Sequence, residues 1–534
     1  MRIALRNGIV AGMAVMVAFF PLAAASGEVR RRFGERYVSS REIAEFIARS
    51  TTVSRVAPNE IAVKRIMTAR RAAPRASRGL PPPEAVEKGF EFFGMGADFT
   101  RADLDLLSAV TNEDNPSFPP IADQGDLGSC ASWSAAYYML TNNTAVVRGW
   151  DAKGDPVSRF SPRWCYNATN MGLDNGGWIH KNIDYFRAFG CALKVDFDYA
   201  NPVKPTAEPG EYQDLSTDSG LWRKALDFRP GDETFLVDKL DTEDGLGKLK
   251  AVLANGYVAC FGTSYMDGWE VRGISGGPHA GKQCAVGMHQ ESDYSGHAMT
   301  IVGYDDGVWV DVNKNGKADS GEKGALRVAN SWGPGYGDNG YVWVLYDALR
   351  EESSIPGYSL QNRERLVRGA LAYYAIGRQE YEPLLLAEVR LSCRKRSNVS
   401  VMGAVGDYPD FDGKTGLRWL PNFSSEDSGP VALSGRKNEA VSFYLDLTDL
   451  VTDSGTQKWN IVVKDAAAGN PTYVESIRLA QWSNGEWLFS ECHPHVPGRL
   501  DDEEKRFWFR YAFGGDFPSY RTESASGAAR AGSR

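Results

Sequence analysis

The 534-residue chain lacks an excess of positive charge: 60 Lys and Arg residues stand against 68 Asp and Glu residues, which gives a net charge of −8. A general nucleic-acid binder needs surplus cations to displace the counterions of phosphates, so we expect no nucleic-acid partner. The chain also lacks a repeat of 20–50 residues, which excludes a repeat architecture. With 43% hydrophobic and 24% charged residues, it has the composition of a globular protein of several folding units.

Long apolar runs are also scarce, and the longest lies at the N-terminus. It extends from Ile9 to Leu22, follows Arg2 and Arg6, and ends at three alanines, residues 23–25. This is the three-zone pattern of a secretory signal peptide, and the run is shorter than the roughly 20 residues of a spanning helix. We therefore predict a signal peptide over residues 1–25, no membrane span, and a secreted or periplasmic protein.

Cysteine is sparse and odd in number, with seven residues. In an oxidising compartment six of them can form three disulfides, and one thiol then remains. The pairing is open from sequence, and we predict only Cys393–Cys492, because both residues lie in the C-terminal part of the chain. The remaining thiol is the candidate for reactivity.

The N-terminal part is basic, although the chain as a whole is acidic. Residues 26–80 hold 13 Lys or Arg against 5 Asp or Glu. This asymmetry predicts a basic segment that lies against an acidic body, and a solvated basic arm is the alternative. Within it, Ile43, Phe46 and Ile47 share one face of a helix predicted from about Arg41 to Arg49. Three prolines, residues 81–83, then form a stiff linker.

The last third of the chain has the pattern of an antiparallel β-sandwich. Short alternating runs separated by turn residues predict strands. They cover residues 384–391, 400–405, 441–447 and 459–463. We predict a β-sandwich over residues 382–498 and a largely disordered tail over 499–534.

Three short boxes hold residues suited to nucleophilic chemistry. Cys130 follows a Gly-rich turn and precedes the apolar-periodic stretch Trp133–Leu140, which predicts a helix with Cys130 at its N-terminus. The positive end of a helix and a neighbouring imidazolium lower the pKa of a thiol, so we expect a thiolate. His297 begins a predicted strand, and Asn330 opens an Asn-Ser-Trp-Gly box.

With Gln124 before them, Cys130, His297 and Asn330 resemble, in order and context, the boxes of the papain-like cysteine peptidases. The resemblance spans roughly residues 100–378 and implies an α+β fold: a papain-like two-lobed domain over 101–378, with a helical left lobe and a β-rich right lobe. It implies Cys130 as nucleophile, His297 as base and later acid, and Asn330 as the group that orients the imidazole. Gln124 would donate to an oxyanion hole, and Trp332 would shield the hydrogen bond between His297 and Asn330.

The same resemblance points to a substrate groove. Gly176 and Gly177 are similar to the family's Gly-Gly segment, whose bare backbone pairs with an extended peptide. Ala298 would border the S2 pocket, which receives the side chain two residues before the cleaved bond. A pair of glycines also occurs in ordinary turns, which is the alternative for residues 176–177. The chain departs from many members at Ala131, where a Trp usually follows the nucleophile.

A segment between His297 and Asn330 fits the twelve-residue calcium loop Asp-x-Asn-x-Asn-Gly-x5-Glu. Its flanks, residues 308–310 and 325–328, read as strands, so we expect a loop on a hairpin with a structural Ca²⁺. A metal-free Asn-Gly hairpin turn is the alternative. The expected ligands are Asp311, Asn313, Asn315, the carbonyl of Lys317, Asp319 through water, and Glu322.

The resemblance implies a secreted cysteine endopeptidase that hydrolyses proteins or peptides through an acyl-thioester on Cys130. It needs no cofactor for catalysis, and we expect a monomer. Residues 26–100 would be a pro-segment and linker that masks an acidic cleft and is removed at a site such as Arg70-Arg71. The alternative, from another class, is a catalytically silent surface-binding protein that uses the peptidase fold and the β-sandwich as a recognition scaffold.

Overall fold

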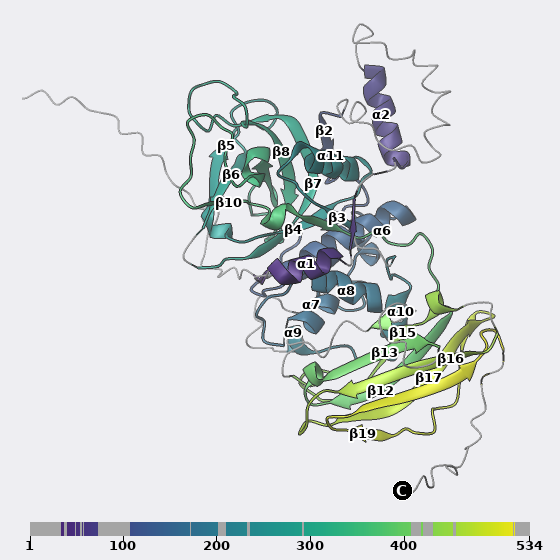
Figure 1. The fold of residues 1–534 in the computed structure, drawn as a ribbon. Helices are drawn as coiled ribbons and strands as arrows, with labels where there is room; N and C mark the ends of the chain where they lie inside the picture. Colours follow the sequence, from purple (N-terminus) through teal and green to yellow (C-terminus); the bar gives the residue numbers. More distant parts are fainter. Residues whose placement is uncertain are drawn as a thin grey trace, which may run out of the picture.

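The computed structural model describes residues 34–36, 40–48, 50–53, 56, 58–72, 107–170, 172–200, 210–231, 235–290, 293–406, 418–419, 431–451, 455–515 and 517. The predicted signal peptide, the proline linker and the end of the predicted tail lie outside these residues. In Figure 1 a β-rich region lies at the upper left, a group of helices lies in the middle, and two further sheets lie at the lower right. None of the helices within the described ranges has the length and apolar character needed to cross a bilayer.

The helical region begins at Cys130, as the sequence predicts. Helix α5 (Cys130–Ser132) continues into the π-helical segment η1 (Trp133–Leu140) and then into α6 (Thr141–Arg148). Every residue of η1 is buried, because aromatic and apolar side chains surround it on all sides. Four helices of this region follow: α7 (Pro162–Thr169), α8 (Ile179–Phe189), α9 (Gly210–Gln213) and α10 (Ser219–Leu226).

The β-rich region is built on one sheet of 11 strands, in the order β1-β3-β11-β4-β7-β8-β9-β6-β10, with β2 paired to β7 and β5 paired to β6. Helix α11 (Glu243–Ala254) packs beside it. The longest strand is β7, and its first eight residues, His297–Tyr304, are all buried. Together with the helices, this sheet confirms the mixed α and β content predicted. The strands are β1 (Thr51–Thr52), β2 (Ala109–Thr111), β3 (Phe235–Val237), β4 (Ala259–Thr263), β5 (Trp269–Gly273), β6 (Gln283–His289), β7 (His297–Trp309), β8 (Lys323–Ala329), β9 (Tyr341–Leu345), β10 (Arg363–Glu364) and β11 (Ala372–Tyr374).

Short 3₁₀ helices connect several of these elements. Each covers three or four residues, as is usual for this helix type. They are η2 (Pro156–Ser158), η3 (Met266–Gly268), η4 (Tyr346–Leu349), η5 (Arg368–Ala370), η6 (Arg396–Asn398) and η8 (Thr448–Leu450).

Two antiparallel sheets make up the C-terminal region. One has the order β15-β12-β17-β18 with β19 on β17, and the other has the order β14-β13-β16-β20. A Cβ on Gly403 of β13 would lie 2.9 Å from Leu447 and 3.2 Å from Leu445, so the two sheets approach one another there. The four strands predicted from the sequence are present. The strands are β12 (Leu385–Cys393), β13 (Val399–Val405), β14 (Arg418–Trp419), β15 (Val441–Asp446), β16 (Gln457–Asp465), β17 (Thr472–Ser483), β18 (Glu486–Phe489), β19 (Gly498–Leu500) and β20 (Glu504–Tyr511).

The predicted boundary at residue 498 is wrong. Strand β20 pairs with β16 over its whole length, from Glu504 to Tyr511. Phe507, Phe509 and Tyr511 are buried, while the residues between them are exposed. Alternation of this kind is the pattern of a strand with one face in the core, and the ordered sheet therefore includes much of what we expected to be tail.

The C-terminal sheets contact the helical region through aromatic rings and an arginine. The ring of Phe443 in β15 lies 6.1 Å from that of Phe189 in α8 and 6.2 Å from that of Trp222 in α10. Beside them, Arg229 forms ion pairs with Asp446 and Asp449. Apolar packing and buried charge thus join the two regions.

The basic N-terminal segment contains the predicted helix and one more. Helix α1 (Ser40–Ala48) matches the helix expected from about Arg41 to Arg49, and its Phe46 is buried with its ring 5.7 Å from that of Tyr373. The second helix, α2 (Glu60–Ala72), was not predicted. Asn59 caps it, because its side chain accepts hydrogen bonds from the N–H groups of residues 61 and 62. The expected cleavage site, Arg70-Arg71, lies in the last turns of α2.

All seven cysteines have free thiols. The predicted Cys393–Cys492 disulfide is wrong. Cys393 pairs with Thr472 at the start of β17, whereas the residue after Cys492 bonds to Ile477, five residues along the same strand. Five residues of strand span roughly 17 Å, far more than a disulfide bridges. The buried thiols of Cys165 and Cys191, by contrast, contact one another through a hydrogen bond.

Candidate active site

Cys130, His297 and Asn330 come together from three elements. Cys130 is the first residue of α5, His297 is the first residue of β7, and Asn330 directly follows β8. Strands β7 and β8 are antiparallel with Thr300 opposite Ala329, which brings the imidazole and the amide to the same place. His297 Nε2 and Asn330 Oδ1 are 2.7 Å apart. The backbone of Ala298 hydrogen-bonds the Cys130 thiol, so the thiol lies beside the same end of β7.

Aromatic rings cover the hydrogen bond between His297 and Asn330. The rings of His297 and Trp332 have centroids 4.5 Å apart at an angle of 37°, and Tyr336 packs edge-on against Trp332 at 5.1 Å. Trp332 is buried. A hydrogen bond in such apolar surroundings is strong, because water does not compete for it. Asn330 thus fixes the imidazole with Nε2 as the donor and with Nδ1 on the opposite side of the ring.

Gln124 is held between the Cys130 turn and the Asn330 box. Its Oε1 accepts a hydrogen bond of 2.6 Å from the Ser331 hydroxyl, and its Nε2 donates one of 2.7 Å to the Leu127 carbonyl. Its backbone N–H also donates to the Ser331 carbonyl at 2.8 Å. The side chain is fully buried. This amide therefore has one fixed orientation next to the candidate nucleophile.

Residues 34–36 of the chain's own N-terminal segment lie beside Cys130. The N–H of Gly177 donates to the carbonyl of Gly34 at 2.7 Å, and the N–H of Arg36 donates to the carbonyl of Gly177 at 3.0 Å. On the other side, the N–H of Glu35 donates to the carbonyl of Gly296 at 3.0 Å. Glu35 forms a parallel bridge with Gly177. Residue 177, expected to pair with an extended peptide, is thus paired with an extended stretch of this chain.

Glycines make room for this segment. A Cβ on Gly176, whose φ is +87°, would overlap the carbonyl of Gly34, and a Cβ on Gly34 would overlap the carbonyl of Gly128. A Cβ on Gly296 would likewise overlap the carbonyl of Glu35. Such close backbone approach is a reason for glycine at these positions. Gly128, Gly176 and Gly296 therefore line a groove that fits an extended backbone, and Gly34 of the segment allows its close approach.

The Glu35 side chain enters a pocket whose base is Arg368. The two side chains form an ion pair, and their exposed fractions are only 4% and 13%. Arg368 also donates to the carbonyl of Thr263 at 3.3 Å and to the carbonyl of Arg36 at 3.3 Å. A Cβ on Gly262 would overlap the Glu35 carboxylate, so this glycine makes space for the acid.

This contact corrects the expectation of a basic segment on an acidic cleft. Where residues 34–36 enter the cleft, the segment contributes the carboxylate and the cleft contributes the cation. Burial raises the pKa of Glu35 to about 7, against the lowering effect of Arg368. The pKa of Arg368 is raised because Glu35 and neighbouring tyrosines outweigh its burial, so its guanidinium stays charged. Sequence reasoning missed both residues, since no local motif marks either one.

The expected thiolate is also wrong for this arrangement. Burial raises the pKa of Cys130 to about 12, and the Glu35 carboxylate adds to the effect, although backbone hydrogen bonds from Ala298, Gly34 and Ala131 oppose it. Burial lowers the pKa of His297 to about 4, against the effect of its bond to Asn330. With residues 34–36 in place, the thiol and the imidazole are therefore both neutral at physiological pH.

The candidate calcium loop lies between β7 and β8, at the end where Trp309 pairs with Lys323. Asp311 accepts from the N–H groups of Asn315 and Gly316, each at 3.0 Å. Glu322, which is fully buried, accepts from backbone N–H groups of Val312, Asn313 and Asp319 at 2.7–3.1 Å. Within the described residues, no three His, Cys, Asp or Glu side chains converge closely enough to hold a metal.

The other donors of this loop are amides and a backbone carbonyl. Asn313 and Asn315 both donate to the Asp319 carboxylate, which lowers the pKa of Asp319. Asn313, Asn315 and Asp319 are therefore joined by hydrogen bonds within the loop, and the oxygens of these residues and of Asp311 are of the hard type that Ca²⁺ takes. The set of residues fits this ion.

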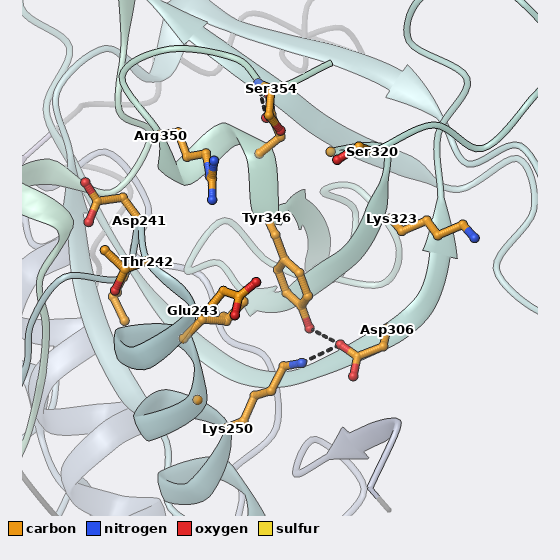
Figure 2. A pocket seen from close by; sticks show the side chains of 15 residues that line it. Asp241, Thr242, Glu243, Lys250, Asp306, Ser320, Lys323, Tyr346, Arg350 and Ser354 are labelled. Atoms are coloured by element: carbon orange, nitrogen blue, oxygen red, sulfur yellow. Dashed lines mark hydrogen bonds and ion pairs between the residues drawn. The ribbon is translucent and has the colours of Figure 1, made fainter. Parts of the chain in front are cut away.

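A separate cavity of about 360 Å³ lies between the start of α11 and the segment around Tyr346. Figure 2 shows that its charged side chains include members of both signs. The Asp306 carboxylate accepts from Lys250 Nζ at 2.6 Å and from the Tyr346 hydroxyl at 2.7 Å. The cavity contains none of the predicted site residues and is distinct from the groove beside Cys130.

The chain is similar in sequence to one curated protein. Over 236 residues the chain is 23% identical to an uncharacterized peptidase C1-like protein of Acanthamoeba polyphaga mimivirus. The alignment covers 43% of this chain and 66% of the viral protein, just under two thirds of that relative's length. No family model matches the chain.

Solved structures similar to the chain include a digestive procathepsin L of Tenebrio molitor, with 16% identity, a TM-score of 0.33, and coverage of 50% of this chain and 69% of that one. Xylellain, a cysteine protease from Xylella fastidiosa, gives 16% identity and a TM-score of 0.34 over 65% of this chain and 97% of that one. Bromelain protease from Ananas comosus gives 15% identity and a TM-score of 0.33, over 50% of this chain and 98% of that one.

Proposed function

We propose that this chain, a member of the papain-like family of cysteine peptidases, is an endopeptidase that hydrolyses peptide bonds through an acyl-thioester on Cys130. One observation supports this above the others. The thiol of Cys130 and the His297–Asn330 pair face the same groove in which residues 34–36 already lie as an extended polypeptide. A groove that pairs with backbone beside a nucleophile and its base is suited to cutting a polypeptide.

In the proposed reaction His297 Nδ1 takes the proton of the Cys130 thiol, and the thiolate attacks the carbonyl carbon of the substrate. A C–S bond forms, and the oxyanion is stabilised by the Cys130 N–H and by Gln124 Nε2. The imidazolium gives its proton to the leaving amine as the C–N bond breaks. Water, deprotonated by His297, then cleaves the thioester and releases the acid. Asn330 Oδ1 accepts the Nε2 proton throughout and keeps the ring in this tautomer.

We also propose that residues 26–100 are a pro-segment and that the described arrangement is the inactive form. The Gly34–Arg36 backbone and the Glu35 side chain fill the groove, and the resulting burial leaves Cys130 and His297 neutral. Departure of the segment would return water to the thiol and lower its pKa. Secretion of the enzyme, and cleavage of the pro-segment in the compartment it reaches, are parts of the same proposal.

The test is labelling with a thiol-directed epoxide followed by mass spectrometry. One adduct is expected, on Cys130, and it should be absent in Cys130→Ala. Casein hydrolysis should fall at least about 10³-fold in that variant, as for loss of a nucleophile in other hydrolases. Cys492→Ala, which removes the exposed cysteine, is the matched control and should retain both properties. No Cys130-dependent adduct together with no hydrolysis would contradict the proposal and favour a silent scaffold.

We propose, further, that the loop at residues 311–322 binds Ca²⁺ and ties β7 to β8. The oxygens of its side chains and the buried Glu322 support this. Added Ca²⁺ should raise the melting temperature of the protein by a few degrees, since binding to the folded form stabilises it. Glu322→Gln should abolish the rise, and Glu351→Gln, at an exposed position, should leave it intact. An equal rise in Glu322→Gln would refute the assignment.

The two C-terminal sheets are, in this proposal, a β-sandwich accessory domain of the secreted enzyme. Their close approach at Gly403 and the packing of Phe443 against α8 and α10 support that view. The helical region and the 11-stranded sheet would be the two lobes, with the groove between Gly177 on one and Gly296 on the other.

A further inference from the structure

We infer that Arg368 makes the S2 pocket of this enzyme specific for an acidic side chain, so that its substrates are polypeptides with Glu two residues before the cleaved bond. The inference rests on the proposed function and names its substrate class. Its basis is the pocket that Glu35 occupies, which lies beside Gly296 and next to Ala298, the residue expected to border S2.

The pocket has a buried cation at its base, and Tyr294 and Tyr373 also lie near the Glu35 carboxylate. Arg368 reaches it from η5, and its guanidinium is oriented by the Thr263 carbonyl and by the Ser264 hydroxyl, each at 3.3 Å. Gly262 and Gly296 leave two walls without side chains. The ring of Tyr294 lies 5.8 Å from the guanidinium carbon of Arg368. A long, unbranched, negatively charged side chain therefore fits both the space and the charge.

Arg368 depends on the groove's occupant for its counter-charge. Within the described parts of the chain, Glu35 is the one carboxylate that forms an ion pair with Arg368. Its other partners are neutral oxygens of residues 36, 263 and 264. A guanidinium buried without an anion is strongly unfavourable. When residues 34–36 leave, the pocket will favour a substrate that restores the pair, and it will reject a Lys, whose ammonium would face Arg368.

The register of the backbone favours Glu over Asp. Glu35 reaches Arg368 while its own N–H stays bonded to the Gly296 carbonyl at 3.0 Å. An Asp at the same position is one methylene shorter, so it meets the guanidinium only if the backbone moves away from Gly296. The hydrogen bond from Arg368 to the Glu35 carboxylate is sensitive to such a displacement.

The first experiment measures kcat/KM with internally quenched peptides that differ only at the residue two positions before the cleaved bond. The enzyme is the mature form, after removal of the pro-segment, and the residues compared are Glu, Leu and Lys. We expect Glu to exceed Leu at least about tenfold and Lys at least about a hundredfold, as for paired against unpaired buried charge. Leu equal to or better than Glu would overturn the inference while leaving the peptidase assignment intact.

Two variants assign the preference to Arg368. Arg368→Glu should reverse the order of the Glu and Lys peptides. Arg365→Gln is the matched control: this arginine also forms ion pairs, with Asp241 and Glu351, but contacts no groove residue through them. It should keep the wild-type order. A preference for Glu that persists in Arg368→Glu would refute the role of Arg368.

The second experiment does not depend on catalysis. In the uncleaved chain, the rate at which iodoacetamide modifies Cys130 reports how firmly residues 34–36 hold the groove, and the exposed Cys492 is an internal standard. Glu35→Lys and Arg368→Glu should each raise that rate at least about tenfold, which corresponds to about 1.4 kcal/mol, and the double variant should restore it. Glu35→Leu as slow as wild type would show that an apolar side chain serves equally well and would overturn the inference. If no peptide is cut by any variant, the proposed function fails, and the labelling rates still decide the charge preference of the pocket.

Discussion

Two arginines attach other parts of the chain to the helical and β-rich regions, and they differ in what surrounds them. Arg229 binds Asp446 and Asp449 of the C-terminal region, with exposed fractions of 2% for Arg229 and 1% for Asp446, beside the packed rings of Phe443 and Trp222. Arg368 binds Glu35 in a groove lined by glycines. The contact of Arg229 lies within an apolar interface, and the contact of Arg368 lies in a groove lined mainly by backbone atoms.

The difference separates a permanent contact from a releasable one. Burial of large aromatic side chains stabilises the C-terminal contact independently of the ion pair, at roughly 25 cal/mol per Å² of apolar surface. Glycine walls contribute almost no apolar surface. The contacts of residues 34–36 include three hydrogen bonds between backbones, one from Arg368 to the Arg36 carbonyl, the ion pair of Glu35, and the stacking of Arg36 on Trp178. Each such bond contributes a net 0.5–1.5 kcal/mol at about room temperature, which a competing peptide can replace. The groove can therefore exchange its occupant, whereas the C-terminal interface cannot.

The largest effect is expected at the permanent contact. Arg229→Ala leaves the buried carboxylate of Asp446 without its cation, and the free energy of unfolding should fall by about 3–5 kcal/mol in denaturant titrations. The control is Arg436→Ala at the same interface, where the pair with Asp214 is half exposed and a loss of at most about 1 kcal/mol is expected. Equal losses in the two variants would mean that the buried ion pair of Arg229 contributes no more to stability than the half-exposed pair of Arg436.

The next effect is at the releasable contact. A Cβ on Gly34 would overlap the backbone carbonyl of Gly128, which cannot move aside, so Gly34→Ala should displace the segment. Modification of Cys130 by iodoacetamide should accelerate about tenfold or more, while the melting temperature stays near that of wild type. Gly231→Ala, where no atom lies within 4 Å of the added Cβ, is the control. An unchanged Cys130 rate would mean that the segment does not lie in the groove in solution.

A smaller effect is expected from pH. The pKa of Glu35 in the groove, about 7, is above its ordinary value of 4.5, so docking favours the protonated acid. The stabilisation is complete below about pH 4.5 and is lost as pH rises through about 7. The Cys130 labelling rate of wild type is divided by that of Glu35→Gln, because the titration of the thiol itself then cancels. This ratio should rise with pH across this range, since the segment of wild type docks less firmly. The other titratable groups that face Glu35 have raised pKa values and remain neutral there: Cys130, Cys260, Tyr294 and Tyr373.

Arg368→Met tests whether Glu35 is the group that titrates. Arg368 lowers the pKa of Glu35 against the effect of burial, so its loss should move the midpoint of the ratio to higher pH. A midpoint that stays near 7 in this variant, or a ratio that falls with pH in wild type, would contradict the assignment of the titration to Glu35.

The smallest effect on the groove is expected at α2. Arg65 donates to the carbonyls of Leu253 and Ala254 at the end of α11, at 3.0 and 2.9 Å. Arg65→Ala should loosen α2 by about 1–2 kcal/mol, which amide hydrogen exchange of residues 60–72 measures. Labelling of Cys130 should change less than about twofold, because Arg65 contacts none of the groove residues. A tenfold change would mean that the whole N-terminal segment is held as one unit.

Local patterns predicted the parts of the fold and site that depend on neighbours in sequence. The helix that begins at Cys130, the strand that begins at His297 and four strands of the C-terminal sheets each carry their own periodicity. The boxes around Gln124 and Asn330 were recognised for the same reason, since each is a continuous motif. The structure then brings these boxes together.

Contacts between distant residues could not be predicted in this way. Glu35 and Arg368 are 333 positions apart, and neither belongs to a periodic pattern that marks it. Strand β20 was predicted as tail: six charged residues, 501–506, come directly before Phe507, and the buried Phe507 and Phe509 alternate with exposed residues of the strand. The lowered pKa expected for Cys130 rested on the helix end and a neighbouring imidazolium, and burial with residues 34–36 in place outweighs both effects.

Strand β1 gives the N-terminal segment a second attachment, with its own consequence. Thr51 and Thr52 pair in parallel with Phe235 and Leu236 of β3 and form the outer edge of the 11-stranded sheet (Figure 1). Removal of the segment turns β3 into an edge strand with open N–H and C=O groups, next to the apolar residues 235–237. Exposed edges of this kind template pairing with other chains. In the proposed mature form this edge of β3 would be open to pairing with other chains, and the lifetime of that form would depend on what covers the edge.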